Sequence, residues 1–296
     1  MKILNYGSLN IDDTYRVEHI VQPGETLTSL TLERFPGGKG LNQSVALARA
    51  GAEVWHGGCI GADGVFLKNL CAEAGADVSL IREIGEPTGH AIIQVDRDGQ
   101  NSIVLFPGTN RMQKDEWLEE AVGSFAEGDW LLLQNEINGI GRLMSAAKEK
   151  GMKIALNPSP FDVRVTECPL NCVDLFLLNE VEGEQLTGEQ DPEKILTVIH
   201  ERWPEADVLL TLGKNGSVFF SHGSIIRQDA YRVEAVDTTG AGDTYTGYFL
   251  AGILRGDEPA LAMKYAAMAS AIAVTRKGAA ISIPERDEVK KALRDK

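Results

Sequence analysis

Apolar and polar positions alternate along the chain with two different periods. Short apolar runs rich in β-branched residues recur, and longer stretches with helical spacing lie between them. The short runs predict strands at Lys2–Tyr6, Glu53–Ile60, Trp130–Leu133, Lys153–Leu156, Asp174–Leu178 and Val208–Leu212. The periodic stretches predict helices at Lys39–Ala50, Gly64–Ala74, Lys114–Ser124, Gly139–Lys150, Pro192–Trp203 and Pro259–Val274. This order is typical of an α/β fold, a doubly wound and mainly parallel sheet flanked by helices.

Two segments interrupt the alternation and predict antiparallel β structure instead. The first is Asp12–Phe35; in the second, His90–Asp96 and Asn101–Phe106 flank the turn signal Asp98-Gly99. We expect a small β lid made of residues 12–35 and 89–106. The α/β core would then comprise residues 1–11, 36–88 and 107–296. An edge extension of the main sheet is the alternative, and periodicity does not separate the two.

Acids and amides follow the predicted strands. Ligands of an open parallel sheet bind beyond the carboxyl ends of its strands, so these positions indicate a binding site. A single Asn or Asp there is explained equally well as a loop or helix-capping residue. The residues concerned are Asn10, Asp12, Gln134, Asn135, Glu136, Asn157, Asn179, Glu180, Thr211, Gly213 and Asp237, the last after an apolar run at Tyr231–Val236.

The sharpest motif is the sequence DTTGAGD, which spans residues 237–243 and opens a helical pattern at Thr244–Leu254. Gly240 and Gly242 leave backbone N–H groups at a helix start open to an anion, and the helix dipole favours a phosphoryl group there. An acid at position 243 would repel a static phosphate. Accepting a proton from an attacking hydroxyl would explain it, and simple stabilisation of the helix N-terminus is the alternative.

A second glycine turn, GGKG at residues 37–40, precedes the first helix. Lys39 and Asn42 are three residues apart, so they share a helix face and can present a cation and an amide to one small polar ligand. The turn is not a Walker loop, and the chain has neither a dinucleotide fingerprint nor a Gly-x-Ser-x-Gly elbow. Its five histidines lack the spacing of metal ligands.

Composition and charge narrow the partners. The chain has 296 residues, enough for one large domain with an appendage. Its net charge of −14 disfavours nucleic acid and anionic membrane surfaces as partners. No signal peptide or membrane-length apolar run is evident, so a cytoplasmic location is expected. The cysteines, Cys59, Cys71, Cys168 and Cys172, are too sparse for a disulfide framework and are expected to be reduced.

The motifs together resemble the ribokinase-like (PfkB) carbohydrate kinases. The similar segments are GSLNID at 7–12, PGET at 23–26, GGKGLNQ at 37–43, NEVE at 179–182, TGAGD at 239–243 and AVTRKG at 273–278. They extend from the first strand to Ile283, nearly the whole chain. The resemblance implies ATP-dependent phosphorylation of a sugar hydroxyl.

The resemblance also implies roles by position. The sugar would be held by Asp12, Gly38, Lys39, Asn42 and Glu136, with Asp243 as general base and the amides of Gly240, Ala241 and Gly242 as an anion hole. Mg²⁺ and its waters would be organised by Asn179 and Glu182. The nucleotide would lie along Asn179, Thr211, Gly213, Gly216 and Gly242. A monovalent cation, usually K⁺, would be held mostly by carbonyls of Asp237, Thr239, Ala273, Arg276, Gly278 and Ser282.

Two positions depart from the family pattern. Ala267 stands where a His beside the adenine is expected, and Asn135 stands where an apolar residue is expected. Three carboxylates in one pocket favour a neutral sugar, because only Lys39 and Arg34 could answer an anionic substrate. The resemblance makes ribose the first choice, ahead of fructose-like, deoxy and modified sugars. A nucleoside kinase of the same fold and a non-catalytic sugar sensor are the alternatives. Pairing of two exposed lid edges predicts a homodimer.

Overall fold

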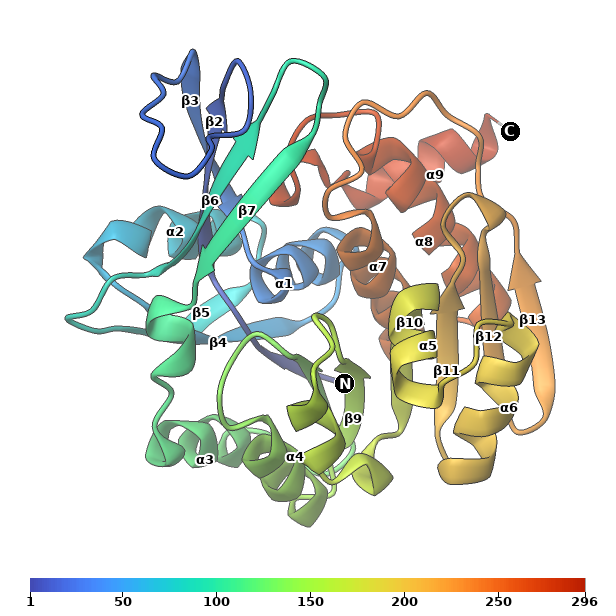
Figure 1. Cartoon of the computed structure of the whole chain (residues 1–296). Coiled ribbons are helices and arrows are strands. Elements are labelled where there is room, and N and C mark those ends of the chain that lie inside the picture. Colours follow the sequence, from blue (N-terminus) through green and yellow to red (C-terminus); the bar gives the residue numbers. More distant parts are fainter. Residues whose placement is uncertain (296) are drawn as a thin grey trace.

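The computed structural model describes residues 1–295, and two separate sheets organise them (Figure 1). The larger sheet has nine strands in the order β13-β12-β11-β10-β9-β8-β1-β4-β5. The seven strands from β11 across to β5 run parallel to one another. Strands β12 and β13 are antiparallel additions at the β11 edge. The strands are β1 (Ile3–Tyr6), β4 (Val54–Ile60), β5 (Asp77–Glu83), β8 (Trp130–Gln134), β9 (Lys153–Asn157), β10 (Leu175–Asn179), β11 (Asp207–Thr211), β12 (Ser217–Ser221) and β13 (Ser224–Gln228).

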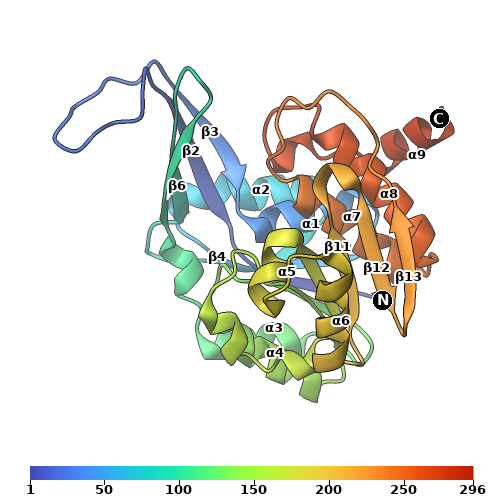
Figure 2. The same ribbon diagram turned by 45° about the vertical axis from the view of Figure 1, so that its right-hand side comes forward.

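Helices cover both faces of this sheet, as the doubly wound prediction requires (Figures 1 and 2). One apolar cluster lies under α1 (Lys39–Arg49), α2 (Val65–Glu73), α7 (Ala241–Arg255), α8 (Pro259–Ala273) and α9 (Arg286–Arg294). The other lies under α3 (Asp115–Gly123), α4 (Ile140–Glu149), α5 (Glu180–Thr187) and α6 (Pro192–Arg202). Successive strand residues enter opposite clusters, so the strands are buried on both sides.

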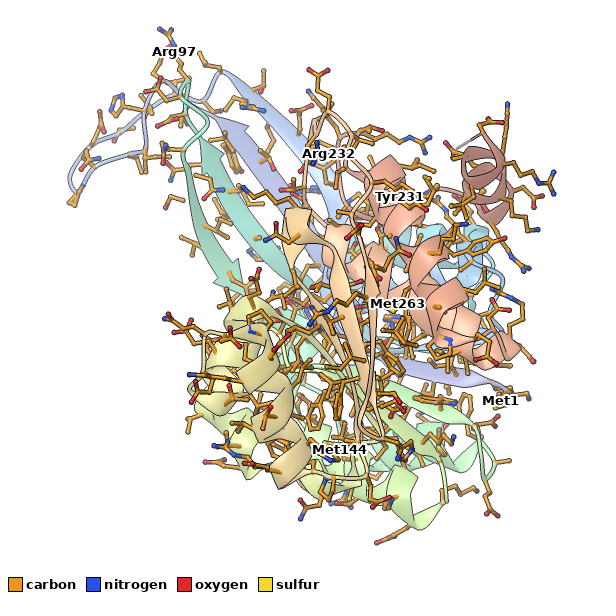
Figure 3. All side chains as sticks on the ribbon, turned by 90° about the vertical axis from the view of Figure 1, so that its right-hand side faces the viewer. Met1, Arg97, Met144, Tyr231, Arg232 and Met263 are labelled. Atoms are coloured by element: carbon orange, nitrogen blue, oxygen red, sulfur yellow. The ribbon has the colours of Figure 1, made fainter. Side chains whose placement is uncertain are left out.

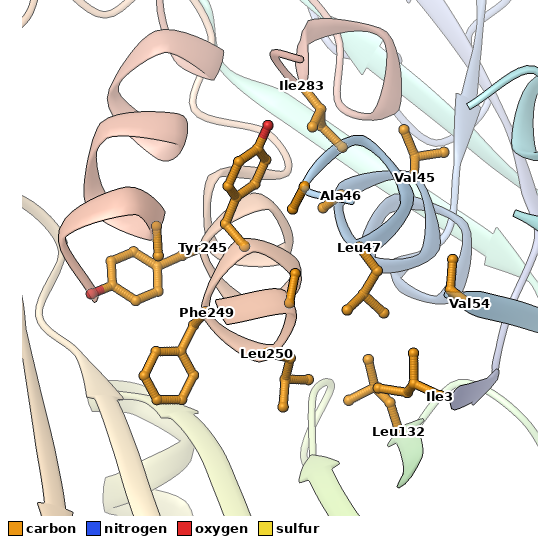
Figure 4. Packing of buried hydrophobic residues seen from close by; sticks show 14 of the residues in the cluster. Ile3, Val45, Ala46, Leu47, Val54, Leu132, Tyr245, Phe249, Leu250 and Ile283 are labelled. Atoms are coloured by element: carbon orange, nitrogen blue, oxygen red, sulfur yellow. The ribbon is translucent and has the colours of Figure 1, made fainter. Parts of the chain in front are cut away.

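Helices α1 and α7 pack closely against each other and against the middle of the sheet. Leu47 of α1 and Leu250 of α7 are both directed toward Ile3 of β1 (Figure 4). Gly247 permits the close approach, because a Cβ there would collide with Ala46. The two glycine turns that open these helices are therefore held in a fixed relation to each other.

The smaller sheet has the order β3-β2-β6-β7 and stands away from the α/β core (Figure 1). Its strands are β2 (Asn10–Arg16), β3 (Thr31–Gly37), β6 (Gly89–Val95) and β7 (Asn101–Phe106). Arg97 marks its far end (Figure 3). The β2–β3 and β6–β7 pairs are antiparallel, but β2 joins β6 in parallel. The edge extension of the main sheet, left open by the sequence, is therefore wrong.

The sequence missed several short elements and misplaced one. All six predicted strands of the main sheet and all the predicted helices are present, but β5, β12, β13, α5 and α9 were not anticipated. The run Tyr231–Val236 is irregular rather than a strand, and most of it is exposed. It belongs to neither of the two sheets; the N–H of Val236 donates instead to the carbonyl of Val274, at 2.8 Å.

Two predictions about the chemistry of the whole chain can also be checked. All four cysteines are free thiols, and Cys59 and Cys71 are buried. Among residues 1–295, no helix is both long enough and apolar enough to cross a bilayer.

Candidate active site

The carboxyl ends of four adjacent strands bring polar side chains to one edge of the main sheet. The strand register pairs Gln134 with Asn157, and Asn179 with Thr211. A cavity of about 170 Å³ opens at this edge. The polar side chains that line it include Lys39, Asn157, Ser159, Asn179, Glu182, Thr211, Thr238, Asp243 and Thr246, beside the backbone of Gly240, Ala241 and Gly242.

The first turn of α7 lies on the helix side of this cavity. Gly240 has a left-handed φ of 73°, and a Cβ there would lie only 2.9 Å from the Cβ of Ala279, so both conformation and space require glycine. A Cβ on Gly242, in contrast, would meet nothing within 4 Å. The N–H of Ala241 donates to the carbonyl of Thr238 at 3.2 Å, so an anion at this turn would share or replace that bond.

Asp243 follows this turn and is only 7% exposed. Its two carboxylate oxygens accept separate amide hydrogen bonds, Oδ2 from Asn42 at 2.9 Å and Oδ1 from Gln43 at 2.8 Å. The Asp243 carboxylate raises the pKa of Lys39 against the opposing effect of burial. The structure therefore brings together the three side chains predicted from the two glycine turns, and adds Gln43. Its place beside Asn42 at the start of α1 was the available signal.

Glu136 continues the site toward the smaller sheet. Its Oε2 accepts a hydrogen bond from the backbone N–H of Lys39 at 2.9 Å and another from the hydroxyl of Ser8. Burial raises the pKa of Glu136, and the charge of Lys39 opposes this shift. Gly38 has a left-handed φ of 94° at the same bend. Sequence reasoning missed Ser8, because it lies 128 residues from the glutamate that it contacts.

Asp12 reaches the site from β2 of the smaller sheet. Its carboxylate lies against Gly37, where a Cβ would collide with it. Burial, with a further contribution from Glu136, raises the pKa of Asp12 to about 6. The neighbouring Asp13 points to the other face of the sheet and pairs with Arg34 at 2.7 Å. The sequence had suggested Arg34 as a basic residue of this site, and the structure instead pairs it with Asp13 on the other face of the sheet.

A larger cavity of about 590 Å³ adjoins the first and shares Thr211, Thr238, Ala241 and Gly242 with it. Gly213 and Gly216 line it near the strand, and Ala267 lines it from α8. The segment with Tyr231 and Arg232 forms another wall (Figure 3). On the α8 side, Ala267, Ala271 and Val274 make the cavity apolar at the place where the family pattern predicts a histidine.

Comparison with known proteins shows which family this fold belongs to. Residues 1–286 match the pfkB family of carbohydrate kinases. The chain belongs to this family. It is 38% identical to a ribokinase of Haemophilus influenzae over 292 residues, which cover 95% of each chain. It is therefore a phosphotransferase with an alcohol acceptor.

Solved structures of the family superpose over almost the whole chain. A ribokinase of Cryptococcus neoformans in complex with ADP has a TM-score of 0.87 at 32% identity and covers 99% of both chains. A ribokinase of Arabidopsis thaliana complexed with ribose and ATP has a TM-score of 0.84 at 31% identity, covering 99% of this chain and 98% of that one. The family fold, with its smaller separate sheet, is thus confirmed.

Asn179 and Glu182 form a capping box at the start of α5. The Asn179 side chain accepts from the N–H of Glu182 at 2.9 Å, while the Glu182 carboxylate accepts from the backbone and side-chain nitrogens of Asn179. Glu182 is only 7% exposed and still lines the smaller cavity. Its oxygens keep spare lone pairs, which fits contact with a hydrated cation rather than direct ligation. Within residues 1–295, no cluster of three acidic, His or Cys ligands could hold a metal directly.

The predicted monovalent-cation residues come from two segments that the structure places side by side. Asp237 accepts hydrogen bonds from the N–H groups of Thr239 and Gly278, both at 2.9 Å. Burial alone would raise the pKa of Asp237, but these hydrogen bonds outweigh it and lower the pKa. The side chain of Arg276 turns away to pair with Glu288, and the hydroxyl of the buried Ser282 donates to the carbonyl of Ala279 at 2.8 Å.

Asn135, the other departure from the family pattern, has a structural role here. Its side chain donates to the carbonyl of Pro160 at 2.7 Å, and its backbone N–H donates to the carbonyl of Ser159 at 3.0 Å. Asn135 thus fastens the loop after β9, whose Ser159 lines the smaller cavity, to the end of β8. An apolar residue could not make the side-chain bond.

Proposed function

We propose that this protein transfers the γ-phosphoryl group of ATP to a hydroxyl of a neutral sugar, with ribose the first choice. The carrying observation is the Asp243 carboxylate, which two amides hold in the smaller cavity with Lys39, directly after the Ala241-Gly242 turn that both cavities share. A wide apolar cavity suits a nucleotide, and the narrower polar one suits the reacting hydroxyl.

Sugar recognition is assigned to Asp12, Gly38, Lys39, Asn42 and Glu136. An ionised carboxylate accepts hydrogen bonds from two hydroxyl groups, so Asp12 and Glu136 suit a diol. The loss of Arg34 from the site strengthens the case for a neutral substrate, because Lys39 already faces Asp243 and Glu136. Ribose is preferred because the Haemophilus relative is a ribokinase and the Arabidopsis one is complexed with ribose and ATP.

In the proposed reaction, Asp243 accepts the proton of the sugar hydroxyl as that oxygen attacks the γ-phosphorus. The bond from the γ-phosphorus to the bridging oxygen breaks, and ADP leaves with the electron pair. The amides of Gly240, Ala241 and Gly242 and the dipole of α7 stabilise the charge that develops on the transferred group. Thr211, Gly213 and Gly216 lie along the nucleotide.

Two cations complete the proposal. Mg²⁺, when bound, neutralises phosphate charge; Asn179 and Glu182 would hold its waters. K⁺ would occupy the place between residues 237–239 and 273–282, where Asp237 lowers the local potential and fixes both segments. Activity in K⁺ that exceeds activity in Na⁺ at equal ionic strength would support the second assignment, and equal activity would contradict it.

We also propose a homodimer formed through the lid. Strand register places Leu105 on the Asp12 face of the smaller sheet, through Ala91, and Ile103 lies two residues away on the same face. Ile103 is 57% and Leu105 52% exposed, which is unusual for large apolar side chains beside a binding site. Covering them with a second lid would bury this surface and the sheet edge. Sedimentation as a monomer at micromolar concentration would refute the dimer.

A panel of sugars and nucleosides, assayed for ADP formation with Mg-ATP, tests the proposed function. We expect ribose to give the highest kcat/KM and ATP hydrolysis without sugar to be low, because closure of a lid excludes water. A nucleoside as the best acceptor would favour the alternative kinase. No acceptor-dependent ADP formation, together with tight sugar binding, would favour a sensor.

A further inference from the structure

A chain of buried amide side chains lies directly behind Asp243. Gln43 joins Asp243 to Gln134, whose Nε2 donates to Gln43 Oε1 at 2.7 Å. The same Nε2 donates to Oδ1 of Asn5 at 2.9 Å, and Asn5 Nδ2 donates to the carbonyl of Gly40 at 2.7 Å. Asn5, Gln43 and Gln134 are each at most 1% exposed. The chain thus crosses the core from β1 and β8 to the carboxylate at the start of α7.

Both ends of this chain can only accept hydrogen bonds, and this fixes its direction. The Gly40 carbonyl requires the nitrogen of Asn5, so the oxygen of Asn5 faces Gln134. Gln134 must then present its nitrogen both to Asn5 and to Gln43. Its own Oε1 is left buried without a hydrogen-bond partner among residues 1–295. Gln43 consequently presents its oxygen to Gln134 and its nitrogen to Asp243.

The unpartnered oxygen shows that the network tolerates a cost to keep this direction. A buried carbonyl without a hydrogen bond destabilises a fold by roughly 1–3 kcal/mol. Turning the Gln134 amide over would give that oxygen no donor and would set it against the oxygens of Asn5 and Gln43. The arrangement observed is therefore the one in which Asp243 always meets a donor.

We propose that Gln43, oriented by Gln134, is a positioning residue for the proposed reaction: its amide fixes the rotation of the Asp243 carboxylate so that its remaining lone pairs face the attacking hydroxyl. This inference rests on the proposed function of Asp243 as general base. Asn42 binds the other oxygen but is itself assigned to the sugar, whereas Gln43 is 1% exposed and is assigned to neither substrate. The charged groups that face Asp243 from neighbouring elements are Lys39 of α1 and Glu136 after β8.

The principal test is Gln43→Met, which keeps the volume and removes both hydrogen bonds. A misplacement of about 1 Å in a reacting group can slow a reaction about 10²-fold, so we expect kcat to fall by roughly 10- to 100-fold. KM for ribose and for ATP should change less than about threefold, because uniform binding is untouched. Gln134→Met leaves Gln43 free to turn over, so it should lower kcat in the same way but less.

Ser44→Ala is the matched control. Ser44 bonds Asn5 and His56 in the same buried network, both at 2.7 Å. It makes no hydrogen bond to Gln134, Gln43 or Asp243. We expect this variant to lose stability without a selective loss of kcat. If Ser44→Ala lowers kcat as much as Gln43→Met does, the effect is one of general core packing and the proposal is wrong.

A double-mutant cycle with Asp243→Ala distinguishes the positioning role of Gln43 from the proposed role of Asp243 as general base. With the carboxylate absent, adding Gln43→Met should change the residual kcat less than about threefold, because Gln43 acts only through Asp243. Full activity of Asp243→Ala would overturn the proposed base itself. Loss of activity in Asp243→Ala with wild-type kcat in Gln43→Met would overturn only the positioning role.

Discussion

The site draws carboxylates from two regions of very different character. Asp243 belongs to the α1–α7 corner of the core, is nearly buried, and has an amide donor on each oxygen. Asp12 belongs to the smaller sheet, where its carboxylate accepts no hydrogen bond from residues 1–295 and only Gly37 makes room for it. One region is organised before any substrate binds. The other region has a partly buried acid that receives no donor from residues 1–295.

The difference indicates a division of labour. The core corner is held by helix packing and a buried polar network, which suits a group that must be aligned when a proton moves. The lid acid is destabilised in the free protein and would gain donors only when sugar hydroxyls arrive. The smaller sheet also exposes large apolar side chains, among them Ile103 and Leu105, which the rest of residues 1–295 leaves uncovered. Under the proposed function, alignment would therefore reside in the core and recognition partly in the lid.

A large effect is expected from filling the open space on the core side of the site. Gly242→Ala adds a methyl group where the protein leaves open space next to the amides of α7. Folding should be unaffected, but the methyl would obstruct the transferred phosphoryl group. Because loss of one anion-hole donor costs about 10²–10³ in rate, we expect kcat/KM for ATP to fall about 10²-fold.

Gly256→Ala at the other end of α7 is the control for that prediction. Gly256 has a left-handed φ of 87° and lies outside the site, so alanine there should destabilise the fold by about 1 kcal/mol while leaving kcat/KM unchanged. Steady-state kinetics and urea unfolding of both variants should therefore give opposite profiles. Similar profiles would mean that α7 responds as a whole and that the proposed anion hole is not special.

The lid carboxylate should show a trade between binding and stability. Asp12→Asn is expected to lower kcat/KM for ribose by roughly 10- to 100-fold, since a hydrogen bond to a charged group is worth about 1.5–3 kcal/mol. The same change should stabilise the free protein at pH 7 by on the order of 2 kcal/mol, because the fold raises the pKa of Asp12 to about 6.

The sign of this effect makes it testable by pH. The folded protein holds a proton on Asp12 that the unfolded chain releases, so wild-type stability falls as pH rises from about 4 through 6. The advantage of Asp12→Asn should be absent near pH 4 and complete near pH 7. Asp13→Asn, which breaks only the exposed pair with Arg34, should leave the KM for ribose unchanged. Equal effects at both positions would remove Asp12 from the site.

The smallest catalytic effect is expected on the apolar face of the lid. Ile103→Glu puts a charge on the surface that a second lid would cover, so the dissociation constant of the proposed dimer should rise at least about tenfold. Val163→Glu makes the same change at a residue that is 70% exposed and outside the lid. Analytical ultracentrifugation should show dissociation only for Ile103→Glu; two unaffected variants would place the dimer contact elsewhere.

Much of this arrangement could be predicted because it is local. The two glycine turns, the helices after them and the side chains of Lys39, Asn42 and Asp243 follow from short-range spacing. The polar residues at the strand ends follow from the parallel order of the sheet. These features need no knowledge of contacts between distant parts of the chain.

The rest depends on contacts that no local pattern encodes. Gln134 meets Gln43 across 91 residues and Asn5 across 129, and Ser8 meets Glu136 across 128. The parallel pairing of β2 with β6, which turns two hairpins into one sheet, is likewise long-range. Tyr231–Val236 has the composition of a strand but belongs to neither of the two sheets, which is why it is irregular.

The central claim is that Asp243 accepts the proton of the acceptor hydroxyl beside the amino end of α7. The most direct test is kcat of Asp243→Asn with saturating ribose and Mg-ATP, alongside calorimetric binding of both substrates. Loss of a general base typically slows a reaction by about 10²–10⁴-fold, and we expect a fall of that size with both substrates still bound. Turnover at the wild-type rate by this variant would contradict the account.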